Sequence, residues 1–279
     1  MKKKKITGML LVASFIVSVF VPTVSAAAKQ ETVYVITKKS EQYRTDPAYT
    51  TDYTYTANGL LKAFPSIMDD TISFSYKNGR IVKRTMSGHL SKEDTNYTEN
   101  CEYNYGKNGN IKNAKLDYQE IIMSTNENHS GWEKFSANYN KNSMLEGLVY
   151  NESIGSNNGD KYNFLYDKAG NITKMTKLYK LQNGSYETSY MKSYIYDKKG
   201  NMKKIKSEKY GVVSTYKNTY DKNGNLVKKS DGNKVTTYQY KRIKVSAKYA
   251  DAIREQQWEI VNPYFSIYLG WNLEKEFEL

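Results

Sequence analysis

The chain has 279 residues and carries 42 lysine and arginine residues against 29 aspartate and glutamate residues. This length suits one large or two small domains, and a single cysteine, Cys101, excludes an intramolecular disulfide scaffold. The positive charge is concentrated in residues 161–249, which contain 21 basic and six acidic residues. This bias favours either a polyanionic partner or a solvated surface that keeps the chain soluble.

Residues 1–26 are predicted to be a signal peptide. Four lysines, Lys2 to Lys5, precede an apolar run at residues 9–21, and small residues before Ala27 offer a cleavage site near Ala26. The apolar run is too short to span a membrane comfortably. The sequence therefore predicts an exported protein that is secreted or extracellular, with no transmembrane anchor, and whose association with a cell wall would be non-covalent.

The exported part divides into two regions. Residues 27–245 are predicted to form a domain of repeated β-hairpins, and residues 246–279 are predicted to form a C-terminal helix and tail. Glu31–Thr37 ("ETVYVIT") reads as the opening strand, and Asp46-Pro47 marks the turn after it.

One short phrase recurs along the repeat region. "YDKNGNLVKK" at residues 220–229 has near-copies that begin at residues 196 and 166. Each copy has a turn residue, a tyrosine three or four positions before it and an apolar residue two positions after it. The turn residues are Gly59, Gly79, Gly109, Ser143, Gly170, Gly200 and Gly224. A degenerate eighth copy is "YQYKRIKV" at residues 238–245.

Each copy predicts a β-hairpin. In Asp221-Lys222-Asn223-Gly224, aspartate at the first position and glycine at the fourth are typical of a type I turn followed by a left-handed glycine bulge. The flanking residues alternate, with tyrosines on one face and lysine, threonine and serine on the other. The sequence therefore predicts an all-β fold, an antiparallel meander of hairpins that forms an elongated or curved sheet like a solenoid or an open barrel.

These copies resemble the YD-repeat (Rhs-type) family, which is named for the Tyr-Asp hairpin. The resemblance covers roughly residues 53 to 245 and is most specific at 166, 196 and 220. Known members are mostly large secreted or wall-associated proteins whose hairpins coil into β-sheet shells, some of which enclose a toxin. Their repeats are often credited with carbohydrate binding. The chain is similar to a short secreted member in which no toxin domain follows the repeats.

After Val245 the pattern becomes helical. Ser246 is expected to cap a helix that runs to about Val261, and Asn262-Pro263 ends it. Its apolar side consists of Ala250, Ile253, Ile260 and Val261. Because an exposed sheet edge promotes aggregation, we expect this helix and the following "YFSIYLGW" to cap the array. The alternative is a tail that binds a small ligand or docks a partner.

No catalytic motif stands out in the sequence. The repeated Asp-x-x-Gly is not a calcium loop, because the EF-hand pattern needs glycine and glutamate where this chain has Leu226 and Gly232. His89 and His129 lie in polar stretches outside any paired motif, and Cys101 in "ENCEYNY" predicts a buried thiol. We therefore expect a non-catalytic protein that uses no metal or cofactor. A glycan hydrolase built from scattered carboxylates stays open as an alternative.

A binding role fits the composition better. Tyrosine and tryptophan faces stack on sugar rings, and lysines attract phosphates and carboxylates without forked geometry. The predicted ligand-binding cations are Lys203, Lys204, Lys228, Lys229, Lys241, Arg242 and Lys244. The predicted ligand-binding tyrosines are Tyr194, Tyr196, Tyr216, Tyr220, Tyr238 and Tyr240. For each tyrosine the alternative is packing within the sheet.

The first hypothesis is a secreted binding protein whose basic face engages an anionic cell-wall polymer or extracellular glycan. The second is a scaffold or accessory component of a secreted, Rhs-like competition system that holds a secreted protein partner. Nucleic acid is a less natural partner for an exported chain, although lysines mixed with aromatic residues also suit single strands.

Overall fold

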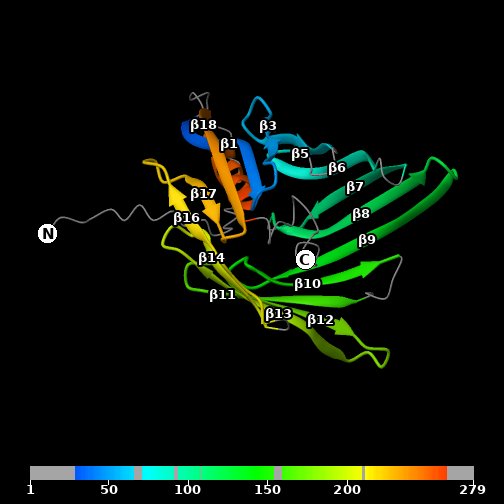
Figure 1. Cartoon of the computed structure of the whole chain (residues 1–279). Helices are drawn as coiled ribbons and strands as arrows, with labels where there is room; N and C mark the ends of the chain where they lie inside the picture. Colours follow the sequence, from blue (N-terminus) through cyan, green and yellow to red (C-terminus); the bar gives the residue numbers. More distant parts are fainter. Residues whose placement is uncertain are drawn as a thin grey trace.

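The computed structural model describes residues 29–65, 71–90, 94–107, 109–153, 159–208 and 211–262 (Figure 1). Its strands form two antiparallel sheets in which successive strands are mostly neighbours, so the predicted all-β meander of hairpins is confirmed. The predicted signal peptide and the predicted tail from residue 263 onward lie outside the described residues.

The larger sheet has 13 strands, ordered from β15 to β3. They are β3 (Thr54–Tyr55), β4 (Leu61–Pro65), β5 (Thr71–Lys77), β6 (Arg80–Leu90), β7 (Thr95–Tyr105), β8 (Ile111–Ile122), β9 (Glu127–Tyr139), β10 (Leu145–Glu152), β11 (Asp160–Tyr166), β12 (Ile172–Lys180), β13 (Tyr186–Tyr196), β14 (Met202–Ser207) and β15 (Val213–Thr215). The smaller sheet has the order β16-β17-β18-β1-β2. Its strands are β1 (Gln30–Tyr43), β2 (Tyr49–Asp52), β16 (Lys217–Tyr220), β17 (Leu226–Ser230) and β18 (Lys234–Ser246), and helix α1 (Ala247–Val261) follows.

The predicted turn geometry is present in six of the seven copies that have a turn residue, and the second copy is the exception. The degenerate eighth copy lies within β18 and forms no turn. In the seventh copy the Gly224 amide donates to the Asp221 carbonyl at 3.1 Å, and Gly224 has a φ of 88°, which glycine adopts without a Cβ clash. Oδ1 of Asp221 accepts the amides of Asn223 and Asn225 at 2.8 and 2.9 Å. The aspartate therefore shapes the turn, as predicted.

Two copies differ in informative ways. In the second copy Lys77 pairs with Arg80, and both Asn78 and Gly79 have positive φ values, 53° and 80°. This is a two-residue type I′ turn, which explains why its tyrosine stands three rather than four residues before the glycine. The fourth copy keeps the common geometry with Ser143 at a φ of 60°.

Most of the repeated tyrosines connect their hairpin to an earlier strand. The Tyr105 hydroxyl donates to the Ile81 carbonyl at 2.6 Å, and Ile81 is the apolar residue that follows the preceding turn. The corresponding bonds run from Tyr76 to Leu61 (2.5 Å), from Tyr166 to Leu145 (2.6 Å), from Tyr240 to Leu226 (2.9 Å) and from Tyr55 to Ile36 in β1 (2.5 Å). The tyrosine and the apolar residue of the repeat thus form one structural pair.

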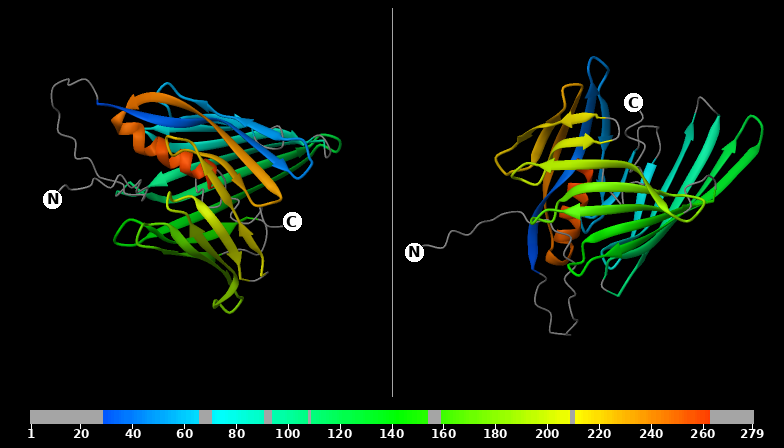
Figure 2. Two further views of the ribbon diagram at one scale, coloured as in Figure 1. Left: turned by 60° about the vertical axis from the view of Figure 1, so that its left-hand side comes forward. Right: turned by 90° about the horizontal axis from the view of Figure 1, so that it is seen from below.

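The two sheets meet at two corners, where consecutive strands change sheet. β2 pairs with β1 and β3 pairs with β4, and between them the Tyr53 amide donates to the Thr37 carbonyl at 3.0 Å. At the second corner β15 pairs with β14 and β16 with β17, and the Tyr216 amide donates to the Lys203 carbonyl at 2.7 Å. The sheets curve around a shared interior (Figures 1 and 2).

The first strand pairs with the last. β1 runs antiparallel to β18 from Gln30 opposite Ser246 to Tyr43 opposite Lys234, with a register shift between Ile36 and Lys38. The predicted opening strand is therefore present and extends to Tyr43. Pairing with β18 gives both strands a neighbour, which protects backbone groups that would otherwise form sheet edges.

The buried side chains line the inner face of both sheets. Cys101 is fully buried, as predicted. The least exposed large side chains are Phe135, Ile36, Leu61, Ile111, Met175, Met202 and Ile205. Ile260 and Val261 of the helix belong to the same cluster, so the helix and the repeats share one core.

Helix α1 lies on the inner side of the curved sheets (Figure 2). It ends at Val261, as predicted, and begins after Ser246, whose side chain makes no capping hydrogen bond. Ala250 and Ile253 pack in a second cluster with Val33 of β1. The helix packs against β1 and β18, and the expectation that it covers an open end of the array stays a prediction.

Three amide side chains fix the helix to the sheets. Oε1 of Gln257 accepts the Ile36 amide at 2.6 Å. Oε1 of Gln256 accepts the Leu61 amide at 2.9 Å and Oδ1 of Asn262 accepts the Met202 amide at 3.3 Å. Each of these backbone amides lies at a register shift, where a β-bulge interrupts the ladder. The helix thereby ties together β1, β4 and β14.

Candidate functional site

Five cations lie in a row of strands on the outer face, opposite the core. We call them the basic strip: Lys204 of β14, Lys217 of β16, Lys228 of β17, and Arg242 and Lys244 of β18. β14 pairs with β15, β15 leads into β16 at the corner, and β16, β17 and β18 are neighbours. Figure 1 shows β14, β16, β17 and β18 on one side of the molecule.

The register fixes the orientation of the strip. Lys204 is opposite Ile195, which is 53% exposed. Lys228 is opposite Thr219 and Thr237, both exposed. Lys244 is opposite the exposed Thr32. Side chains alternate along strands, so these cations point away from the core.

The strip presents cations that the described part of the chain leaves without a carboxylate partner. Lys217, Lys228, Arg242 and Lys244 are exposed and Lys204 is half-buried. Among the described residues, no carboxylate forms an ion pair with any of the five. Nearby lysines differ, since Lys206 pairs with Glu208 at 3.0 Å. An array of exposed cations attracts polyanions at a range set by the ionic strength.

Three of the predicted cations do not belong to the strip. Lys229 is 7% exposed on the inner face, where its Nζ donates to the Val261 carbonyl at 3.4 Å. Lys241 is exposed but opposite the buried Val35, and Lys203 is the extra residue of the bulge in β14. Side chains of adjacent residues in a strand point to opposite faces of the sheet. Lysines that are clustered in the sequence therefore do not all lie on one face.

The predicted ligand-binding tyrosines face the interior. Tyr194, Tyr216 and Tyr238 are buried at 4%, 8% and 6% exposure, so the structure places them in the core rather than on a binding surface. Tyr196, Tyr220 and Tyr240 are half-buried against the same core. Packing within the sheet, the alternative considered from the sequence, describes all six.

Burial and hydrogen bonding act on the repeat aspartates in opposite directions. Burial alone would raise the pKa of Asp221, but hydrogen bonds from the Asn225 side chain and from the amides of Asn225 and Asn223 outweigh it and lower the pKa. Asp197 follows the same rule, with the Tyr220 hydroxyl and the Asn218 side chain as donors. The Asp221 carboxylate is thus held as a charged acceptor inside its own turn, whereas the Asp197 carboxylate also accepts hydrogen bonds from β16.

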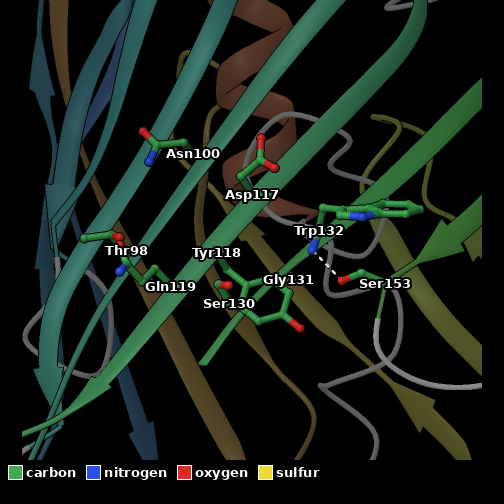
Figure 3. A pocket seen from close by; sticks show the side chains of 9 residues that line it. All are labelled: Thr98, Asn100, Asp117, Tyr118, Gln119, Ser130, Gly131, Trp132 and Ser153. Atoms are coloured by element: carbon green, nitrogen blue, oxygen red, sulfur yellow. Dashed lines mark hydrogen bonds between the residues drawn. The ribbon is translucent and has the colours of Figure 1, made fainter. Parts of the chain in front are cut away.

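A groove of about 630 Å³ crosses β7, β8 and β9 on the outer face (Figure 3). Asp117, Gln119 and Ser130, which line it, are exposed, and Trp132 is half-buried at one side. Its lining consists of Thr98, Asn100, Asp117, Tyr118, Gln119, Ser130, Gly131, Trp132 and Ser153. Hydroxyl, amide, carboxylate and aromatic groups thus meet on one surface.

Sequence reasoning missed Lys217 and Trp132 as site residues. Lys217 stands outside the lysine clusters, and the signal that could have found it is its alternation with Asn218 and Tyr220 along β16. Trp132 is in "SGWEK", between the third and fourth copies, and nothing in the repeat phrase marks it. The exposure of both becomes visible once the strand register is known.

Two further features bear on chemistry. His89 and His129 contact local partners, Asn96 at 2.9 Å and Glu127 at 3.7 Å respectively. Within the described ranges, no group of three or more histidine, cysteine, aspartate or glutamate side chains is placed to hold a metal ion. In the same part of the chain, no helix combines the length and apolar character needed to cross a membrane.

No family model matches the chain, and no curated relative matches it. Among solved structures, a porin-like protein from Bacteroides uniformis has 11% identity and a TM-score of 0.43, over 74% of this chain and 96% of that chain. The Tc holotoxin pore of Photorhabdus luminescens has 11% identity and a TM-score of 0.26, over 70% of this chain and 12% of that chain. A TcdB2-TccC3 structure has 11% identity and a TM-score of 0.27 over 75% of this chain, which spans 14% of that chain.

Proposed function

We propose that the protein is a non-catalytic, extracellular binding protein whose basic strip engages an anionic polymer of the cell envelope or an extracellular anionic glycan. The observation that carries this proposal is the register that gathers five cations from four strands on one outer face. Each of these side chains alternates with inward-facing neighbours, so the core supports the strip from behind.

The chemistry of the strip favours a repeating polyanion. Four of its five cations are lysines, which act as flexible point charges, and Arg242 alone offers a planar fork. Arg242 and Lys244, two apart on β18, are separated by roughly 6.6 Å. Lys228 is opposite Thr237, five residues before Arg242, so Lys228 and Arg242 are roughly 17 Å apart. A polymer with a phosphate or carboxylate in each unit meets such spacings several times, whereas a single small anion meets them once.

We further propose that the chain is a short member of the YD-repeat (Rhs-type) family. The support is the Tyr-Asp phrase at 166, 196 and 220 together with the turn that each of these copies forms. In all three, the glycine amide donates to the aspartate carbonyl at 3.0 to 3.1 Å. The phrase and its hairpin therefore occur together, as the family pattern requires.

The decisive experiment compares two fourfold lysine variants for binding to purified bacterial cell wall. The strip variant carries Lys204→Gln, Lys217→Gln, Lys228→Gln and Lys244→Gln. The control variant neutralises four exposed lysines on other strands and turns, Lys62, Lys77, Lys112 and Lys141. Both lose the same net charge, so a difference between them reports position rather than overall charge.

We expect the strip variant to bind at least about 4-fold more weakly, since each of the four exposed ion pairs contributes roughly 0.2–1 kcal/mol. Binding of the unmodified protein should weaken as salt rises. Equal binding by the two variants would remove the strip from consideration. If cell wall fails to bind while one secreted protein co-purifies stoichiometrically, the chain is instead the scaffold of the second hypothesis.

A further inference from the structure

The groove over β7, β8 and β9 is organised in two rows that run across the strands. Asn100 is opposite Asp117, and Asp117 is opposite Trp132. In the next row Thr98 is opposite Gln119, and Gln119 is opposite Ser130. Three neighbouring strands span about 10 Å and alternate residues about 6.6 Å, so the two rows offer a surface comparable to one or two sugar rings.

Trp132 is held from its backbone, which leaves the indole at the side of the groove (Figure 3). Its amide donates to Oγ of Ser153 at 2.7 Å, and the Ser153 amide donates to the Trp132 carbonyl at 2.8 Å. Nζ of Lys134 lies 4.7 Å from the centre of the indole. The two hydrogen bonds fix the backbone of Trp132, and the indole forms one wall of the groove.

The polar groups of the groove match hydroxyl-bearing ligands rather than ions. Its one charged lining residue, Asp117, pairs with Lys115 at 2.5 Å, so the charge is locally balanced. Asn100 and Gln119 each carry an amide donor and acceptor, and Thr98 and Ser130 carry hydroxyls. A sugar hydroxyl both donates and accepts hydrogen bonds, and the apolar face of a pyranose packs on an aromatic ring.

Other ligand classes fit less well. The groove lies on a sheet face where the backbone groups of β7, β8 and β9 are paired with each other, so a peptide cannot add as a further strand there. A polyanion would meet the Asp117 carboxylate without an excess of cations in the lining. An apolar ligand would leave amides and hydroxyls without their hydration.

We propose that this groove is a second binding site, separate from the basic strip, and that it takes an uncharged pyranose unit of a glycan. Trp132 supplies the stacking surface, and Asn100, Asp117 and Gln119 supply hydrogen bonds to ring hydroxyls. The strip begins at β14 and the groove ends at β9, so the two sites use different strands and different forces.

The test is isothermal titration of the full chain with two neutral probes, cellohexaose and chitohexaose. We expect at least one probe to bind, and Trp132→Ala to weaken that binding on the order of 10-fold or more, as truncation of an aromatic anchor commonly does. Trp132→Phe, which keeps an aromatic face, should stay within about 3-fold. Gln119→Ala, an exposed polar truncation that leaves the core intact, provides a second measure of the same site.

The salt dependence separates this proposal from the function proposed above. Binding of the neutral probe should change little between about 0.05 and about 0.5 M sodium chloride, since no ion pair is formed, and the fourfold strip variant should bind it normally. Absence of binding to both probes would overturn the groove proposal and leave the strip proposal standing. Binding that is equal in Trp132→Ala and the unmodified chain would also overturn it.

Discussion

At the scale of the residue, the repeated tyrosine has a reason to be tyrosine rather than phenylalanine. Its ring packs against the inner core, while its hydroxyl reaches a carbonyl of an earlier hairpin, as Tyr105 reaches Ile81. That carbonyl lies next to a bulge, where the ladder pairing shifts. The hydroxyl therefore satisfies a backbone group that the sheet leaves without its regular partner.

We predict that Tyr105→Phe lowers the free energy of unfolding by about 1 kcal/mol, because it removes one hydrogen bond and leaves a half-buried carbonyl unsatisfied. The matched control is Tyr196→Phe. In the described structure the buried Tyr196 hydroxyl has no hydrogen-bond partner, so its removal should be neutral or slightly stabilising. Urea denaturation of the two variants tests this, and equal losses would contradict the proposed role of the hydroxyl.

The turn residues give a second prediction, based on backbone conformation. Ser143 holds a φ of 60°, a region that costs a residue with a Cβ roughly 1 kcal/mol relative to glycine. Ser143→Gly should therefore stabilise the protein by about 0.5–1 kcal/mol. Gly200→Ser should do the opposite, because Gly200 has a φ of 78° and no atom lies within 4 Å of the position a Cβ would take.

Thermal unfolding of these two variants checks the argument. Since the surroundings of Gly200 are open, a loss of stability there reports the backbone conformation rather than a clash. Unchanged melting temperatures in both variants would show that the turn tolerates serine and glycine alike, and that the repeated glycine serves another purpose.

The sequence predicted the roles of the turn residues correctly and the roles of the tyrosines incompletely. Aspartate and glycine shape their own turn, so local spacing is enough to identify this role, although it does not reveal the bonds that Asp197 accepts from Asn218 and Tyr220 of β16. Tyr194 and Tyr238 were assigned to a ligand, yet they lie in the core. The residues that these tyrosines contact belong to other strands. The alternation of side chains along a strand shows which residues share a face of the sheet, but it does not show which face packs against the core.

At the scale of the element, helix α1 and its C-cap residue carry polar side chains into the interior. Gln256, Gln257 and Asn262 are 5%, 9% and 0% exposed, and each accepts a bulge amide from a different strand. The apolar positions predicted the helix and its end at Val261. The amide contacts could not be predicted, because they depend on where bulges in β1, β4 and β14 come together around the helix.

The helix also contains a carboxyl group with an unusual pKa. Burial, with a further contribution from Asp251, raises the pKa of Glu255 to about 7. Near it, burial and then Glu255 itself raise the pKa of Tyr139 to about 12. In the unfolded chain Glu255 titrates near 4.5. The folded state thus binds a proton at Glu255 more tightly than the unfolded state does. The contribution of this group to the free energy of unfolding is fully present below about pH 4.5 and is lost as the pH rises through about 7.

We predict that Glu255→Gln raises the free energy of unfolding at about pH 8 by on the order of 1–3 kcal/mol and changes it little at about pH 4. The reason is that glutamine stays neutral at both pH values. Urea denaturation across this range measures the difference. A carbon NMR titration that places the Glu255 pKa near its ordinary value would contradict the prediction, as would an equal effect at both ends of the range.

At the scale of the whole molecule, two features go beyond a meander of hairpins. Most strands pair with their neighbours in sequence, but β1 pairs with β18, some 200 residues away, and strands change sheet at Tyr53 and Tyr216. The curved sheet was predicted from the repeats. The pairing of the first strand with the degenerate eighth copy was not predicted. The sequence of a strand indicates that its backbone groups need a neighbouring strand, but it does not indicate which strand that is.

This long-range pairing is a place where the molecule can be cross-linked. Ser40 of β1 is directly opposite Thr237 of β18, and directly opposed residues of antiparallel strands have Cα atoms about 4.5–5.5 Å apart, within the range of a disulfide. Cys101 is fully buried, so it does not compete for a new surface cysteine. The pair Ser40→Cys and Thr237→Cys should therefore oxidise to a single intramolecular disulfide.

The bond would close a loop of nearly 200 residues, and it should raise the free energy of unfolding by about 3–5 kcal/mol relative to the reduced form. The matched control pairs Ser40→Cys with Gln239→Cys, a diagonal neighbour on the same strand that stands opposite Lys38 rather than Ser40. Thiol titration and the urea midpoint, with and without reductant, distinguish the two. Because a shift of two residues along β18 would exchange their behaviour, efficient oxidation of the control and not of the first pair would show that β1 and β18 meet in a different register. A two-residue shift keeps each side chain on its face, so Arg242 and Lys244 would stay on the outer face but would lie opposite other residues of β1.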